Sequence, residues 1–158
     1  MSNDYRIAKE RYQVVVTTLE GEELVGDMFV QPYSPRHTGP EAPGDVLNDG
    51  DPFFPLALEN GDTLLLAKTG IRDVVVPHDG EAVPEEEYAV VGMRMALVEL
   101  TLSGGGACTG SLRLEMPDER PRLLDFLNRF HERFLPLHTE AGTRLVSWRC
   151  IERVRPLD

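Results

Sequence analysis

Residue types that build covalent or metal-held frameworks are scarce in this sequence. Its 158 residues include two cysteines, Cys108 and Cys150, which are too few for a disulfide framework and have no zinc-ligand spacing. The four histidines are scattered, and no pair has a ligand spacing such as H-E-x-x-H. We therefore expect no metal and no cofactor. If the barrel fold described below is right, both cysteines sit on strands and could lie next to each other. We nevertheless expect two buried free thiols.

Long apolar runs are also lacking. No stretch approaches the roughly 18 apolar residues of a membrane span. The first residues, MSNDYRIAKER, contain no apolar segment of the kind that a signal peptide needs. With 41% hydrophobic and 27% charged residues, the composition is that of an ordinary globular chain. The sequence therefore predicts a cytoplasmic protein that does not associate with a membrane.

Positive charge is in short supply, and the only lysines are Lys9 and Lys68. The net charge of −11 is uneven, because residues 1–85 hold 16 acids and 6 bases whereas residues 86–158 hold 11 acids and 10 arginines. An acidic chain repels phosphate backbones at long range, which disfavours general nucleic-acid binding. The asymmetry indicates two halves with different roles.

Catalytic motifs are missing as well. No serine or cysteine has a local signature such as the G-x-S-x-G elbow. The glycine-rich stretch SGGGACTGS, residues 103–111, lacks the lysine of a phosphate-binding loop and is better explained as a hairpin turn. The sequence therefore predicts a protein that is not an enzyme.

A repeat is present instead. The stretch VVVTTLEGEELVGDMFV (14–30) aligns with VELTLSGGGACTGSLRL (98–114) at an offset of 84. The phrase D-x-L-N recurs at an offset of 80, and Phe54-Pro55-Leu56 aligns with Leu135-Pro136-Leu137 at 81. Ordered matches at a nearly constant offset are typical of internal duplication.

The D-x-L-N phrase supplies two sets of repeated positions. Either they bind something twice, or each Asp caps a turn, each Leu fills a core and each Asn bonds nearby backbone. We favour the second interpretation, because capping needs only local geometry. The positions are Asp45, Leu47 and Asn48 in the first copy and Asp125, Leu127 and Asn128 in the second.

Each copy contains five short segments rich in β-branched and aliphatic residues, which predict strands. The expected strands are 14–18, 25–30, 53–58, 63–67 and 72–76, then 98–102, 109–114, 134–138, 144–148 and 151–154. The fold class is therefore mainly β, with two tandem five-stranded small barrels of the Sm-like or SH3-like type at 11–77 and 94–158, joined by a linker at 78–93.

The copies differ between their second and third strands. In the second copy, the apolar residues of ERPRLLDFLNRFHERF follow helical spacing and predict one amphipathic helix over about 120–133. In the first copy, Gly50 and Pro52 limit the corresponding segment to a single turn.

The order of glycine-punctuated strands, ending in LLLAKTGIRDVVVP (64–77), resembles the Sm-like fold of Sm and Hfq-type RNA-binding proteins. That resemblance implies a bent five-stranded barrel, a basic late turn at Lys68 and, in the second copy, Trp148 and Arg149 at the same turn. The early Asp/Asn loop of such RNA sites has no match here. The segment 110–138 also resembles bacterial domains of unknown function with a D-F-L-N and F-L-P-L pattern, from which no activity transfers.

Candidate binding residues cluster in the second copy. Arg129 and Arg133, at i and i+4, are expected to share a helix face. The full candidate set is Arg120, Arg122, Arg129, Arg133, Lys68, Trp148 and Arg149. A solvated helix face is the alternative explanation of these arginines.

Three functions follow as hypotheses. The first is a non-enzymatic interaction, scaffold or adaptor module of the bacterial cytoplasm, with a protein partner or with self-association. The second is Sm-like RNA binding through the second copy. The third is an enzyme or small-ligand binder at the junction between the two units.

Overall fold

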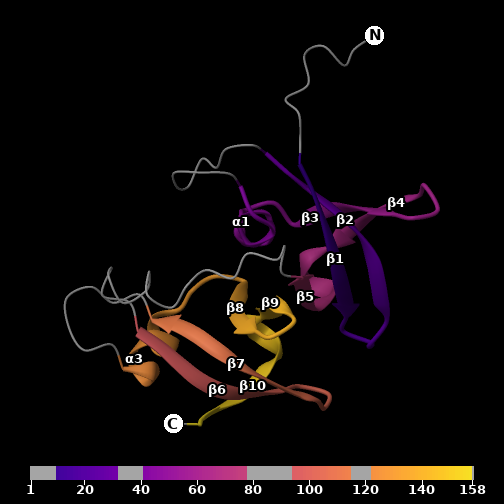
Figure 1. Cartoon of the computed structure of the whole chain (residues 1–158). Coiled ribbons are helices and arrows are strands. Elements are labelled where there is room, and N and C mark those ends of the chain that lie inside the picture. Colours follow the sequence, from indigo (N-terminus) through magenta and orange to yellow (C-terminus); the bar gives the residue numbers. More distant parts are fainter. Residues whose placement is uncertain (1–9, 32–40, 78–93, 115–121, 158) are drawn as a thin grey trace. The chain divides into compact units, whose positions relative to one another are not determined.

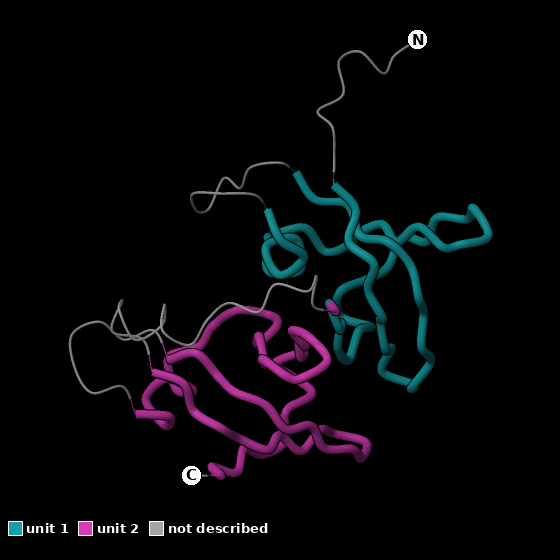
Figure 2. Tube along the Cα trace, in the orientation of Figure 1, with its two compact units in different colours: residues 1–76 teal, residues 77–158 magenta. Residues whose placement is uncertain are grey.

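The computed structural model describes residues 10–31, 41–77, 94–114 and 122–157. The chain divides into two compact units, residues 1–76 and 77–158, shown in different colours in Figure 2. The linker predicted at 78–93 and the candidate Arg120 lie outside the described residues.

The first unit is an antiparallel sheet with one short helix (Figure 1). Its elements are β1 (Glu10–Thr18), β2 (Glu23–Val30), α1 (Pro43–Asn48), β3 (Phe53–Leu58), β4 (Thr63–Ala67), the 3-10 turn η2 (Lys68–Gly70) and β5 (Ile71–Pro77). The strands are ordered β5-β1-β2-β3-β4. The register between β1 and β5 shifts between Thr17 and Thr18.

The second unit has the same sequence of elements and the same strand order (Figure 1). Its elements are β6 (Arg94–Leu102), β7 (Ala107–Leu114), α3 (Leu123–Arg129), β8 (Phe134–Thr139), β9 (Gly142–Ser147), the 3-10 turn η3 (Trp148–Cys150) and β10 (Ile151–Pro156). The strands are ordered β10-β6-β7-β8-β9.

The prediction of a mainly β chain is confirmed, and a strand is present at each of the ten expected positions. The strand order of each unit is open. Among the described residues, β4 does not pair with β5 and β9 does not pair with β10. Strand pairing therefore does not close either unit into a barrel.

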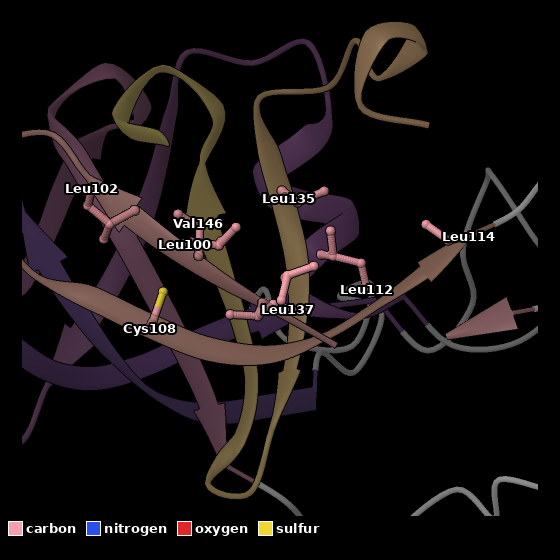
Figure 3. Close-up of a cluster of buried hydrophobic side chains, with 9 residues drawn as sticks. Leu100, Leu102, Cys108, Leu112, Leu114, Leu135, Leu137 and Val146 are labelled. Atoms are coloured by element: carbon pink, nitrogen blue, oxygen red, sulfur yellow. The ribbon is translucent and has the colours of Figure 1, made fainter. Parts of the chain in front are cut away.

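Alternating side chains of the long strands build the cores. In β1, Val14 and Val16 are completely buried while their neighbours are partly exposed, the period of two expected for a sheet with one covered face. The cluster in the second unit gathers residues from β6, β7, β8 and β9, with Cys108 among them (Figure 3). Cys108 and Cys150 are both buried and are not joined in a disulfide, as predicted.

The predicted helix over 120–133 is wrong at its C-terminal end, because α3 stops at Arg129. Phe130 leaves the helix with extended backbone, and its ring packs 4.8 Å from that of Trp148. The backbone N–H of Trp148 donates to the backbone carbonyl of Arg133 at 2.8 Å. These contacts turn the chain toward β8, so Arg129 and Arg133 do not share a helix face.

Backbone hydrogen bonds at the turns recur in both units. Several bonds of the first unit have a counterpart between the aligned residues of the second. Examples are Thr18 N to Glu22 O with Leu102 N to Gly106 O, Leu19 N to Gly70 O with Ser103 N to Cys150 O, and Lys68 N to Pro52 O with Trp148 N to Arg133 O. The two units thus share local geometry as well as strand order.

Candidate protein-interaction surface

The β3–β4 hairpin of the first unit is apolar on its inner face and, apart from Thr63, on its outer face as well. Its inner face carries Phe54 and Leu56, which are buried. On its outer face, Phe53 is 57% exposed, Leu65 is 72% exposed and Pro55 is exposed as well. Because Pro55 lies opposite Leu65 and Phe53 opposite Ala67, these side chains share one face.

The backbone of β4 is unpaired along its outer edge in the part of the chain that the structure describes. The bonds Lys68 N to Pro52 O and Leu58 N to Asp62 O fix which residues of β4 face β3. They place Leu64 and Leu66 in hydrogen-bonded pairs with β3, so Thr63, Leu65 and Ala67 point their N–H and C=O groups away from it. Pro55, which has no N–H, lies opposite Leu65 as this alternation requires.

We call the exposed Phe53, Pro55 and Leu65, together with the outer edge of β4, the hairpin surface. Sheet edges in soluble proteins are normally protected by charged side chains, proline or bulges. The strand β4, with the sequence TLLLA, has none of these features. An unprotected edge beside a contiguous apolar face is typical of a protein-binding site.

The strand β10, at the end of the second unit's sheet, is protected. It carries Glu152, Arg153 and Arg155, ends at Pro156, and its register with β6 shifts between Ile151 and Arg153. A side-chain hydrogen bond to Glu152 raises the pKa of Arg153 above its ordinary value. Arginine is protonated at any working pH, so the protecting charge is always present.

The β8–β9 hairpin of the second unit has the apolar residues Phe134, Pro136 and Leu145 at the positions equivalent to the hairpin surface. Phe134 and Leu145 are buried, whereas Phe53 and Leu65 are exposed. Among the described residues, the exposed apolar outer hairpin face therefore belongs to the first unit.

Lys68, a candidate binding residue, is buried rather than displayed. Its Nζ donates to the Val46 carbonyl at 2.7 Å and to Asp49 Oδ1 at 2.7 Å, and its side chain is only 1% exposed. The contact ties the C-terminal end of α1 to η2, where a cation also complements the helix dipole. This geometry favours a stabilising role over a contact with a ligand.

Trp148 occupies the equivalent turn of the second unit. Its ring packs on Phe130, which in turn lies 5.9 Å from Phe126, so an aromatic cluster replaces the ion pair of the first unit. Arg149 follows Trp148 and is exposed. Arg122, Arg129 and Arg133 are exposed too, and Arg133 is joined to Trp148 through its carbonyl.

The repeated D-x-L-N positions are structural in the first unit. Asp45 Oδ2 accepts the Ala42 N–H at 2.9 Å at the start of α1, and Leu47 is completely buried. In the second unit, Asp125 lies in the first turn of α3 and Leu127 packs against the core while Asn128 is exposed. Asp45 therefore makes a local contact at the start of α1.

The described residues contain no group of three or more His, Cys, Asp or Glu side chains placed to hold a metal ion. None of their helices is long and apolar enough to cross a membrane. Comparison with protein-family models, with curated proteins and with solved structures found no match for this chain. What the structure defines is a mainly β chain of two compact units, with the hairpin surface on the first.

Proposed function

We propose that the chain is a non-enzymatic protein-interaction module of the cytoplasm, a scaffold or adaptor, and that it binds a partner at the hairpin surface. The observation that carries the proposal is the unprotected edge of β4 beside the exposed Phe53 and Leu65. An extended partner segment added along β4 gains main-chain hydrogen bonds from Thr63, Leu65 and Ala67. The apolar face supplies side-chain contacts, of which a large aromatic residue such as Phe53 contributes most.

We also propose that the two units arose by internal duplication and share the Sm-like or SH3-like class of fold. The common strand order, the matching turn hydrogen bonds and the aligned sequence support this origin. On this proposal the duplicated units have diverged, since the apolar outer hairpin face is exposed in the first unit and largely buried in the second.

Capture of partners from an extract of the protein's own cells tests the interaction role. We expect the wild-type chain to retain one or more proteins that Leu65→Lys loses by about tenfold or more, because a charge on the edge opposes strand addition. Leu65 is largely exposed, so its replacement leaves the core of the first unit intact. Quantitative mass spectrometry of the retained proteins provides the measurement.

The matched control is Leu124→Lys, which makes the same change at a leucine of α3 that is 67% exposed. This variant is expected to retain the same proteins as the wild-type chain. Equal recovery with the wild type and both variants would place the interaction away from the hairpin surface and refute the proposal.

RNA binding through the second unit is the alternative function. It is favoured by one arrangement, in which the exposed Arg149 follows the partly exposed Trp148 and the backbone carbonyl of the exposed Arg133 accepts the Trp148 backbone N–H. Arginine pairs with phosphate and an aromatic ring stacks on bases, so this combination suits single-stranded RNA. The net charge of −11 opposes it.

A titration of the protein with short single-stranded RNA at low salt decides between the two functions. Trp148 is the only tryptophan, so its fluorescence reports binding at this site. On the interaction proposal we expect no change in fluorescence. Saturable quenching that is lost in Arg133→Ala/Arg149→Ala, but kept in Arg11→Ala of the first unit, would establish RNA binding instead.

A further inference from the structure

We propose that the hairpin surface is occupied by the hairpin surface of a second copy of this chain, with the two β4 strands antiparallel and centred on Leu65. The inference rests on the interaction role proposed above and specifies the partner. It follows from the register, the side-chain pattern and the charges of this one edge.

The edge of β4 is complementary to itself. Leu65 is the central residue of the strand Thr63–Ala67, and its N–H and C=O point outward together with those of the two end residues. An antiparallel second copy therefore places Leu65 opposite its own equivalent and Thr63 opposite Ala67. Every outward backbone group of one strand then meets a matching group of the other.

The side chains are complementary in the same arrangement. On the outer face, the two exposed Leu65 side chains meet at the two-fold axis, flanked by Pro55 and Phe53 of each copy. On the inner face, Leu64 of one strand lies opposite Leu66 of the other, so each core continues into its neighbour. A contact of this kind is isologous and closes as a dimer.

The charges select the antiparallel arrangement. The strand β4 has no charged residue, so no like charges face each other across the new pair. At one end of the strand, Glu59 and Asp62 lie in the turn, and at the other end the acid Asp49 is paired with Lys68. Antiparallel pairing separates the two Asp62 residues by about 20 Å at about 3.4 Å per residue, beyond a Debye length of about 8 Å. Parallel pairing would bring the two turns together.

Sedimentation equilibrium over a wide range of protein concentration tests the proposal. The wild-type chain is expected to show a monomer–dimer equilibrium that does not extend to larger species. Leu65→Lys is expected to weaken the dimer by about tenfold or more, since two like charges then face each other at the axis. Leu124→Lys is expected to leave the dissociation constant unchanged, and circular dichroism checks that both variants are folded.

The dependence of dimer strength on ionic strength distinguishes this contact from one that is held by opposite charges. Each copy carries a net charge of −11, so screening of this repulsion is expected to strengthen the dimer as salt rises from about 0.05 to about 0.5 M. A contact made by the arginines with acidic groups would weaken over the same range.

A wild-type chain that stays monomeric, or that dimerises equally well with Leu65→Lys, would overturn the proposal. So would growth into open chains, which an isologous contact does not allow. If the wild type is monomeric but Leu65→Lys still loses captured proteins, the second copy is the wrong partner and the interaction role stands. If neither self-association nor capture depends on Leu65, both proposals fail.

Discussion

Gly26→Ala is expected to lower the free energy of unfolding by about 2–4 kcal/mol, through overpacking and the loss of strand pairing. A Cβ at this position would lie 2.6 Å from the Ala57 carbonyl oxygen and 2.9 Å from Leu56 Cγ. The first contact is with backbone, so β3 itself would have to move. Because β2 pairs with β3 only at Gly26–Leu58 and Asp27–Ala57, a small displacement breaks much of this ladder.

The second unit offers an independent copy of the same experiment. A Cβ at Gly110 would lie 2.6 Å from the His138 carbonyl oxygen and 2.8 Å from Leu137 Cγ. Gly110→Ala is therefore expected to have an effect of the same size. Its unfolding can be followed by the fluorescence of Trp148, which belongs to the same unit.

Gly50→Ala is the matched control, because a Cβ there would meet nothing within 4 Å. It is expected to change stability by less than about 1 kcal/mol, with a gain from reduced chain entropy of the unfolded state. Urea denaturation followed by circular dichroism measures all three variants. If Gly26→Ala proves as stable as Gly50→Ala, the close approach of β2 and β3 is not required by the fold.

Asp49→Ala is the second change with a large expected effect, a loss of about 2–4 kcal/mol of stability. Lys68 is buried, and Asp49 and the Val46 carbonyl are the partners of its Nζ. Removing the carboxylate leaves a buried ammonium without a counter-charge. The expected loss of stability is larger than the small contribution of an exposed ion pair. Lys68 is buried, so water does not replace the missing carboxylate.

A double substitution tests whether the unpaired buried charge of Lys68 is the cause of the lost stability. In Lys68→Met/Asp49→Ala neither charge of this pair remains and the apolar volume is kept, so we expect at least half of the lost stability to return. Asp49 also accepts the Asp51 N–H at 2.8 Å, a turn contact that Asn60 makes with the Asp62 N–H at 2.9 Å. Asn60→Ala thus controls for the turn, with an expected loss of about 1 kcal/mol. Additive losses in the double variant would show that Lys68 and Asp49 do not depend on each other.

The strands were predictable because their signals are local. The runs of β-branched and aliphatic residues between glycine turns placed a strand at each of the ten observed positions. The end of α3 was not predictable in this way. Helical spacing of apolar residues continues to Phe134, but the packing of Phe130 on Trp148, 18 residues away along the chain, ends the helix at Arg129.

The candidate binding residues and the hairpin surface also show the difference between what local sequence signals predict and what tertiary contacts decide. Lys68 reads as a basic turn residue in the sequence, yet tertiary contacts bury its charge against α1. Phe53 and Leu65 have the appearance of ordinary strand residues in the sequence. The available signal was that PFFPLAL and TLLLA are apolar at both odd and even positions, whereas a strand with one solvated face alternates.

The sequence by itself determined the class of fold, the two repeated sets of elements and the buried free thiols, because each depends on composition, periodicity or a local turn. The tertiary structure alone decided where α3 ends, that Lys68 is held by Asp49, and that β4 has an open edge beside an exposed apolar face. Those features depend on which side of each strand another element covers. That is a property of strand order and long-range packing, which a linear pattern of apolar residues does not record.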